Sequence, residues 1–530
     1  MIQQPVEKWR SSCRVCRGHL ARASGGRPAR GNRSNTCVPR GQDALATGGP
    51  DARVTSARDA SNSGTVLIVT MWIVLVLAGL VLVLAQAMRV EAVCSANGVS
   101  ILQADAIEQG AVQYVLSYLD NLQGLLPDET DMPCEAVRVG NGAFWIVKAN
   151  SEDDRLCAYG VVDEASKLNL NTARLEMLLF LPDMTDDLAA SIVDWRSSAD
   201  SAPTPGGARS EYYMLLPDPY LCKSSTFETV GELFLVKGAT NSILHGEDAN
   251  RNFVLDPNED DADASEPPDN RDGKLDRRLL PFLTVYSSEP NTAADGSARV
   301  NVNTTSGSSR TTTRGAAPPP QPSAQGNTLT DLLLKSMSTT RVSQVLDVVR
   351  LEQRIRPFAN VLDFAVRARL TQAEFEAIAD YVTTDTQTVL KGRINVNTAP
   401  REVLTCLAGL ESSDVDALIA QRAQTDADTT NIAWVLQAIE PAKAQAIGGL
   451  ITAMAYQFSA DIVSVAGDGR AFRRCHVVID ALQSPPKVIY RQDLTDLGWP
   501  LAPEIIARLR AGASIDEFAP VQTFGKETSK

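Results

Sequence analysis

Apolar positions are unevenly distributed along this chain, and their longest uninterrupted run spans residues 65–88 without a charged side chain. An α-helix rises about 1.5 Å per residue, so a run of this length exceeds the hydrocarbon core of a bilayer, about 30 Å thick. The pattern therefore predicts one membrane-spanning helix. A cleaved secretory signal peptide is the alternative, with a cut after the motif Ala85-Gln86-Ala87, but the run is longer than the apolar core of an ordinary signal peptide.

The helical pattern continues beyond the apolar run. Between residues 89 and 122 apolar side chains recur at spacings of three and four, interrupted only at Gly98 and Gly110. This spacing indicates one long helix that runs from the membrane into the following domain.

Segments rich in β-branched and aromatic residues predict a sheet built from two distant parts of the chain. Residues 144–149 and 155–162 flank a polar turn and are expected to pair as strands. Three later segments have the same character: 458–465, 473–482 and 487–492. The predicted fold class is therefore α+β.

A short pattern, apolar–Asn–apolar–Asn–Thr, occurs three times between the two groups of strands. Its Asn pairs are Asn169 and Asn171, Asn301 and Asn303, and Asn395 and Asn397. After the first and third copies, leucines follow at helical spacing, and Arg196 and Arg422 stand at equal distances from the repeat. The second copy is interrupted by residues 306–327, which have the composition of a linker, and its pattern resumes as far as Arg350.

The spacing within each copy predicts paired helices that pack on one another. The Asn side chains are expected to bond nearby backbone and the Thr to cap the next helix, a structural role. The units also resemble the helix-hairpin-helix modules of DNA-uptake proteins, so a membrane-anchored DNA receptor is an alternative function. However, the turns at 181–187 and 407–414 present carboxylates where such modules hold phosphates.

The charge distribution changes the picture in two ways. The chain has a net charge of −14, yet residues 1–64 hold eleven Lys and Arg against four acids, which leaves about −21 for the rest. So acidic a body disfavours nucleic acid as a partner. The positive charge before the apolar run places the N-terminus in the cytoplasm and the body outside the membrane.

Candidate catalytic chemistry is sparse. The three histidines are His19, His245 and His476, and the sequence contains no nucleophile-elbow, zinc-protease or phosphate-loop motif. A tethered enzyme is the third alternative, but the sequence indicates that the protein is not an enzyme. Cys134 and Cys157 flank the first predicted strand pair at a distance that a disulfide can close in an oxidising compartment, although the sequence fixes no pairing.

One segment has the spacing of a calcium-binding loop. Oxygen-bearing side chains occupy positions 1, 3, 5, 9 and 12 of an EF-hand-like pattern: Asp248, Asn250, Asn252, Asp256 and Glu259. Phe253 replaces the usual glycine at position 6, so strain is expected there. A shorter version follows at Asn270, Asp272 and Asp276. These residues predict bound Ca²⁺, and a solvated acidic loop is the alternative.

Several of these features occur together in one known family. Gly64 directly precedes the apolar run, as in prepilin-like proteins that are cut after such a glycine, which would make Thr65 the mature N-terminus. Val69 stands where most members of that superfamily have Glu. With residues 162–172, Tyr212–Tyr213, 232–238 and 394–401, the chain resembles the K-type minor pseudopilins of type II secretion systems over roughly residues 60–495.

The resemblance implies a domain order. Residues 1–64 are a basic leader, 65–88 the transmembrane helix, 89–167 the pseudopilin helix and first strands, 168–455 an inserted α-helical domain of helix-hairpin-helix-like repeats, 456–495 the closing strands of the pseudopilin α/β core and 496–530 a C-terminal tail.

The resemblance also implies a function and partners. It implies a single-pass inner-membrane protein with a periplasmic body, calcium in the helical domain, and a place at the tip of the pseudopilus, where it initiates and caps assembly for protein export. The implied partners are the I-type and J-type minor pseudopilins, the major pseudopilin, prepilin peptidase and the inner-membrane secretion platform.

Overall fold

The computed structural model describes residues 63–120, 122–127, 131–151, 153–261, 264–304, 328–424 and 431–518. The predicted leader before residue 63 and the predicted linker 306–327 lie outside these ranges. By its contacts the chain divides into two units, one ending at Leu80 and one beginning at Val81.

Helix α1 (Ser63–Leu119) is 57 residues long and passes Gly98 and Gly110 without a break. Its first part is the predicted apolar run, whose side chains from Val66 onward are exposed. It is long and apolar enough to cross a membrane. The helix predicted from the hydrophobic pattern is therefore present, with its end at Leu119.

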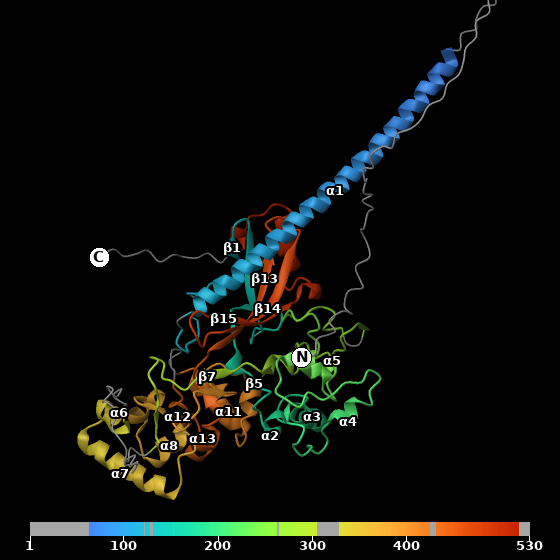
Figure 1. The fold of residues 1–530 in the computed structure, drawn as a ribbon. Coiled ribbons are helices and arrows are strands. Elements are labelled where there is room, and N and C mark those ends of the chain that lie inside the picture. Colours follow the sequence, from blue (N-terminus) through green and yellow to red (C-terminus); the bar gives the residue numbers. More distant parts are fainter. Residues whose placement is uncertain are drawn as a thin grey trace, which may run out of the picture. The chain divides into compact units, whose positions relative to one another are not determined.

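The second unit contains a seven-stranded antiparallel sheet (Figure 1). Its main path, in spatial order, is β1 (Val137–Val139), β2 (Gly142–Lys148), β13 (Gln457–Val465), β14 (Phe472–Asp480) and β15 (Lys487–Asp493). Two short strands lie off this path: β3 (Ala158–Tyr159) pairs with β2, and β4 (Val162–Asp163) pairs with β13. Because β2 pairs with β13, the sheet joins two distant parts of the chain, as the sequence predicts.

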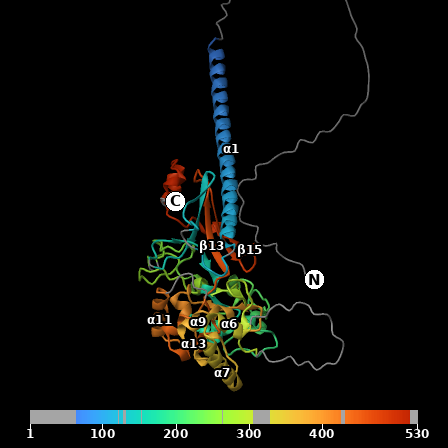
Figure 2. The ribbon, with the colours of Figure 1, turned by 90° about the vertical axis from the view of Figure 1, so that its left-hand side faces the viewer.

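Alternate residues of the strands point to opposite faces of this sheet. On one face Phe144 and Ile146 pack with the last turns of α1, where Val115 is fully buried. On the other face Trp145 packs with α14 (Pro503–Arg510), whose Leu509 is buried. Figure 2 shows α1 and the C-terminal helix on opposite sides of the sheet. The residues after 495, expected as a tail, thus form the second cover of the sheet.

Residues 164–456 carry short helices, which Figure 1 shows gathered at one end of the sheet. They are α2 (Leu175–Leu178), α3 (Asp186–Arg196), α4 (Ser210–Tyr213), α5 (Asn241–His245), α6 (Leu329–Ser336), α7 (Thr339–Ile355), α8 (Val361–Arg367), α9 (Gln372–Glu376), α10 (Arg401–Thr405), α11 (Ser412–Arg422), α12 (Val435–Ala438) and α13 (Pro441–Ile447). Their buried side chains form one continuous apolar cluster.

Each Asn-containing repeat begins with a two-residue strand that pairs in parallel with a later apolar–Thr strand. The pairs are β5 (Leu168–Asn169) with β6 (Leu283–Thr284), β8 (Val300–Asn301) with β9 (Val382–Thr383), and β11 (Ile394–Asn395) with β12 (Ile451–Thr452). We call the segments between these strands the first, second and third units, 168–284, 300–383 and 394–452. A further antiparallel pair, β7 (Ser288–Pro290) with β10 (Val389–Lys391), lies between units.

Candidate functional site

The first Asn of each repeat turns its side chain onto the backbone two residues ahead. The Oδ1 atoms of Asn169, Asn301 and Asn395 accept hydrogen bonds from the backbone N–H of the second Asn at 2.9, 2.9 and 3.0 Å. The Nδ2 group of Asn169 donates to Ser287 Oγ at 2.9 Å, and that of Asn395 donates to Asp163 Oδ2 at 2.8 Å. Each first Asn therefore shapes its own turn and joins it to another segment.

The second Asn clasps a segment farther along the chain. Asn171 donates from Nδ2 to Phe227 O at 3.0 Å and accepts from Phe227 N–H at 2.8 Å. Asn303 holds Phe358 in the same way, at 2.9 and 2.8 Å. In the third unit Asn397 Oδ1 accepts from an indole N–H at 3.2 Å. These side chains are engaged within the fold.

The expectation that the Thr of each repeat caps the next helix is wrong. Thr304 donates to a carbonyl of its own turn at 2.8 Å, and Thr398 donates to Asp163 Oδ2 at 2.7 Å. The residues that precede α2 and α10 are Arg174 and Pro400, and neither makes a side-chain capping bond. Both helices begin too far beyond the repeat for its Thr to reach them.

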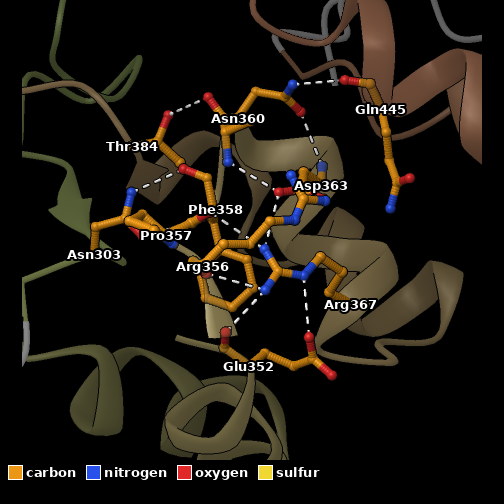
Figure 3. A network of polar contacts seen from close by, with 11 residues as sticks. Asn303, Glu352, Arg356, Pro357, Phe358, Asn360, Asp363, Arg367, Thr384 and Gln445 are labelled. Carbon is orange, nitrogen blue, oxygen red and sulfur yellow. Dashed lines mark hydrogen bonds and ion pairs between the residues drawn. The ribbon is translucent and has the colours of Figure 1, made fainter. Parts of the chain in front are cut away.

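Arg367 organises a polar network in the second unit (Figure 3). Its guanidinium donates to Glu352 Oε2 at 3.1 Å, to Asp363 Oδ2 at 3.2 Å, and to the carbonyl oxygens of Glu352 and Arg356 at 2.9 and 3.0 Å. It also lies 4.7 Å from the ring centroid of Phe358. Phe358 is the residue clasped by the second Asn of this unit, so the network supports the same segment.

Asn360 extends this network to the third unit (Figure 3). Its Oδ1 accepts from Asp363 N–H at 2.9 Å, and its Nδ2 donates to the carbonyl of Gln445 in α13 at 2.7 Å. The buried Asp363 carboxylate is compensated by Arg356 and Arg367. A network so fully paired holds two units together and presents no free acid or base among the residues drawn.

Two half-buried arginines close the first and third units in equivalent ways. Arg196 donates to the carbonyl oxygens of Leu170 and Ala173. Arg422 donates to the two corresponding carbonyls of the third unit, the nearer at 2.7 Å. Burial lowers the pKa of both guanidinium groups, which remain charged because an arginine starts so high.

In the second unit the residue that donates to the repeat carbonyl is not the arginine that the sequence predicts. Gln353 donates to the carbonyl of Val302, which corresponds to Leu170 in the first unit. Arg350, which the repeat pattern placed there, is exposed and lies 3.6 Å from Asp347. The interrupted copy shifted the register by one turn of the long helix α7, so the sequence spacing pointed to the wrong residue.

The helix-hairpin turns carry paired carboxylates. Asp183, after α2, adopts a φ of +54° and forms an ion pair with Arg278. Asp414, in the first turn of α11, accepts from Lys443 Nζ at 2.6 Å. Neither turn presents a cation toward solvent in the way that phosphate binding requires. The DNA-receptor alternative therefore gains no support from these turns.

The first candidate cation loop folds into consecutive turns closed by its own side chains. Asp248 Oδ1 and Asn250 Oδ1 both accept from Asn252 N–H at 2.9 Å, and Asn252 Oδ1 accepts from Val254 N–H at 2.8 Å. Phe253, which stands at the glycine position of the pattern, has a φ of +64°. A side chain in this left-handed region costs about 1 kcal/mol or more, so the loop is strained where the sequence suggests.

Asp256 gathers the polar side chains of this loop. Its Oδ2 accepts from the amide groups of Asn250 and Asn252 at 2.7 and 2.9 Å. Its backbone N–H donates to Glu259 Oε2 at 3.0 Å. All five predicted ligands are therefore linked to one another by hydrogen bonds within the loop.

Glu259 is the group that the loop leaves unsatisfied. It is 1% exposed, and its Oε1 has no hydrogen-bond partner within the described ranges. Burial, together with the nearby carboxylates of Asp248, Asp256 and Glu247, raises the pKa of Glu259 to about 8. A buried carboxylate among other carboxylates is costly unless a cation compensates it.

The second candidate loop is built around a residue that the sequence analysis missed. Glu247, 2% exposed, accepts from the backbone N–H groups of Asn270 and Asp276 at 3.4 and 2.9 Å. Asn270 Oδ1 accepts from Asp272 N–H at 2.8 Å, and its amide donates to Asp276 Oδ2 at 3.1 Å. The only signal in the sequence was the acidic pair that Glu247 forms with Asp248.

The two candidate loops are rich in oxygen-bearing side chains, most of which accept hydrogen bonds from the loop backbone. Among the residues whose side chains the structure describes, no three His, Cys, Asp or Glu side chains converge on one point. The first loop nevertheless combines carboxylate and amide oxygens with the buried, unpartnered Oε1 of Glu259. Oxygen donors of this kind suit a hard cation such as Ca²⁺.

The remaining candidate residues have local roles. Cys134 and Cys157 are not joined to each other, so the disulfide that their spacing allows is not formed. His476 Nδ1 lies 3.2 Å from Asp461 Oδ2, within the sheet. Gly64 and Thr65 lie in the first turn of α1, and cleavage between them stays a prediction.

Comparison with known protein families gives two matches. Residues 160–246 match the family described as Type II secretion system (T2SS), protein K, and residues 394–451 match the same family. The two segments include the first and third Asn repeats. These matches confirm the resemblance to the K-type minor pseudopilins of type II secretion systems.

Among solved structures, the GspK-GspI-GspJ complex of enterotoxigenic Escherichia coli has a similar chain. The similarity covers 74% of this chain and 94% of that chain, at 11% identity and a TM-score of 0.35. No protein of curated function matches.

Proposed function

We propose that this minor pseudopilin stands at the tip of the type II secretion pseudopilus, where it helps to initiate assembly and caps the fibre during export of folded proteins across the outer membrane. The observation that carries the proposal is helix α1. Its first part is apolar on all sides and exposed, and its last turns, near Val115, are buried against the sheet. A helix of this kind suits a membrane anchor that also belongs to a folded domain.

In this proposal α1 spans the inner membrane once. The basic leader keeps the N-terminus in the cytoplasm, and the acidic body lies in the periplasm. Prepilin peptidase cuts after Gly64, so that Thr65 becomes the first residue. Residues 168–455 act as a helical domain inserted into the pseudopilin core, which is supported by the pairing of β2 with β13 on either side of them.

The proposed partners are the I-type and J-type minor pseudopilins, the major pseudopilin, prepilin peptidase and the inner-membrane platform. Support comes from α1 beyond the predicted span, where Val93, Ile101 and Leu102 remain exposed. Apolar side chains outside a bilayer favour burial against another protein. Neighbouring helices of the other minor pseudopilins would supply that cover.

Co-purification from detergent-extracted membranes tests these partners. Leu102 is 69% exposed, so Leu102→Lys should leave the fold intact and reduce recovery of the I-type and J-type subunits at least tenfold. The matched control is Gln109→Lys, which adds the same charge at an exposed polar position of α1. Equal recovery with both variants would contradict the proposed packing along α1.

We also propose that the loops of residues 247–276 bind Ca²⁺. The ligands of the first loop would be Asp248, Asn250, Asn252, Asp256 and Glu259, and those of the second would include Asn270, Asp272 and Asp276. Support comes from the buried, unpaired oxygen of Glu259. The ion would compensate the clustered carboxylates and stabilise the folded loop.

A further inference from the structure

Arg474 is a buried cation that the proposed function does not explain. It lies on β14, is 1% exposed, and has no carboxylate within ion-pair distance in the described part of the chain. Its Nε also lacks a hydrogen-bond partner there. Burying an arginine without a direct counter-ion is costly, so the contacts that it does make must offset that cost.

Those contacts are to the first candidate cation loop. Nη1 of Arg474 donates to the carbonyl oxygen of Asn250 at 2.8 Å, and Nη2 donates to the carbonyl of Arg251. Two adjacent carbonyls thus accept from the two arms of one planar guanidinium, a fork geometry that only arginine provides. The rigid sheet thereby fixes the backbone at positions 3 and 4 of the loop.

The fixed segment is the one that most needs support. Arg251 has a φ of +57°, and Phe253 two residues later has a φ of +64°. Left-handed residues with side chains persist only where surrounding contacts impose the conformation. These turns direct the oxygens of Asp248, Asn250 and Asn252, which are predicted ligands, so the loop would relax away from its ligating shape without the carbonyl contacts.

A second set of contacts ties the same loops to the sheet. Arg277 Nη2 donates to Asp154 Oδ1 at 2.6 Å, next to strand β3. Leu255 N–H donates to the carbonyl of Asp154 at 2.7 Å, and Leu275 N–H donates to its Oδ2 at 3.3 Å. Both loops therefore lie at the junction between the sheet and the first unit.

We infer that Arg474 is a positioning residue for the proposed cation site: by holding the carbonyls of Asn250 and Arg251 it keeps the first loop in its ligating shape and couples cation binding to the sheet. The inference rests on the proposed calcium binding. Partners that orient metal ligands without touching the metal typically contribute about 10- to 100-fold to affinity.

The neighbouring residue supplies a matched control. Arg473 lies on the opposite face of β14, because adjacent residues of a strand alternate, and its Nε lies 2.6 Å from Asp105 of α1. Arg473→Met and Arg474→Met therefore remove the same group from the same strand, one away from the loop and one beneath it.

Calorimetric titration of the full chain in detergent with CaCl₂ tests the inference. Arg474→Met should weaken binding about 10- to 100-fold, whereas Arg473→Met should stay within about twofold of the parent. The loss of a nearby positive charge would by itself tighten binding. Parent-like or tighter binding by Arg474→Met would therefore overturn the positioning role while leaving calcium binding intact.

Failure of the underlying proposal has a different signature. If the parent chain itself takes up no Ca²⁺, the calcium site and the role of Arg474 fall together. If Arg474→Met does not fold, hydrogen exchange on the parent chain decides. The inference expects Ca²⁺ to slow exchange in residues 248–259 and also in 474–476, but not in 137–147 at the far side of the sheet. Slowing confined to the loop would overturn the coupling.

Discussion

Two of the polar junctions between the sheet and the helical units differ in how completely their buried groups are satisfied. We call residues 163–167, with their partners, the acid junction and residues 247–277 the loop junction. In the acid junction Asp163 accepts hydrogen bonds from Ala165 N–H, Asn395 Nδ2 and Thr398 Oγ1, at 2.8, 2.8 and 2.7 Å. Glu164 pairs with Lys167 Nζ at 2.5 Å.

The loop junction leaves buried groups without partners. Glu259 Oε1 has none within the described residues, and neither has Nε of Arg474, whose other guanidinium nitrogens contact this loop. Buried polar groups in native proteins are nearly always satisfied, so such exceptions call for an explanation. The difference teaches that the acid junction is satisfied by groups of the chain itself, whereas the loop junction leaves a buried carboxylate oxygen that the proposed cation would compensate. Four predictions test this contrast.

The largest expected effect is in the acid junction. Glu164→Gln removes the charge partner of the half-buried Lys167 and should lower the free energy of unfolding by about 3 kcal/mol. Urea unfolding of the full chain in detergent measures this loss. Glu228→Gln is the control, because that carboxylate is 83% exposed beside Lys223 and should change stability by less than about 0.5 kcal/mol. Equal losses of unfolding free energy in the two variants would contradict a special role for the acid junction in stability.

The next largest expected effect is the stabilisation by calcium, which should depend on the loop junction and not on the acid junction. Saturating Ca²⁺ at about 100 times its dissociation constant should add about 2.7 kcal/mol to the parent protein and raise its melting temperature by about 5 °C. Glu259→Gln should lose most of this rise. In chelator at neutral pH it should change stability little, because burial raises the pKa of Glu259 to about 8 and the carboxyl is then largely protonated. Glu164→Gln should keep the rise. A melting temperature indifferent to chelator in the parent would remove calcium from the loop junction.

A smaller effect concerns pH at the acid junction. Burial raises the pKa of Asp163 to about 6, above its unfolded value near 4. A raised carboxyl pKa means that the folded state holds its proton more tightly, so stability declines as pH rises from about 4 to 6. In excess calcium, the free energy of unfolding should decline by about 1 to 2 kcal/mol over this pH range, and the decline should be absent in Asp163→Asn. An unchanged pH profile in that variant would assign the decline to another group.

The smallest expected effect lies inside a unit, away from both junctions. Gln353→Ala leaves the buried carbonyl of Val302 without its donor and should cost about 1 kcal/mol. Arg350→Ala should cost less than about 0.5 kcal/mol, because its side chain is exposed. Chemical unfolding compares the two. A larger loss of stability for Arg350→Ala than for Gln353→Ala would instead support Arg350 as the equivalent of Arg196 and Arg422, as the repeat pattern suggested.

Much of the architecture was predictable because it depends on local patterns. The apolar run, the continuing helical stripe and the β-branched segments correspond to α1, β2, β13, β14 and β15 within about two residues at most ends. The repeat also pointed to the Asn side chains that shape the turns. These features follow from hydrophobic periodicity and side-chain chemistry, which the sequence carries directly.

The features that were missed depend on contacts between distant segments. The strands that close each unit have only two residues, for example Leu283–Thr284, too few for any periodic pattern. Glu247 and Arg474 act through backbone groups more than twenty residues away. α14 forms the second cover of the sheet, but its short length made it resemble a tail. Only the folded chain brings these groups together.

The most direct test of the central claim, that this is a processed and membrane-anchored minor pseudopilin, is the N-terminus of the mature protein. The full chain should be expressed with prepilin peptidase, extracted from membranes and sequenced from its N-terminal end. We expect the sequence to start at Thr65. A chain that keeps its leader, or one that begins after Ala87 and is recovered from the soluble periplasmic fraction, would contradict the claim.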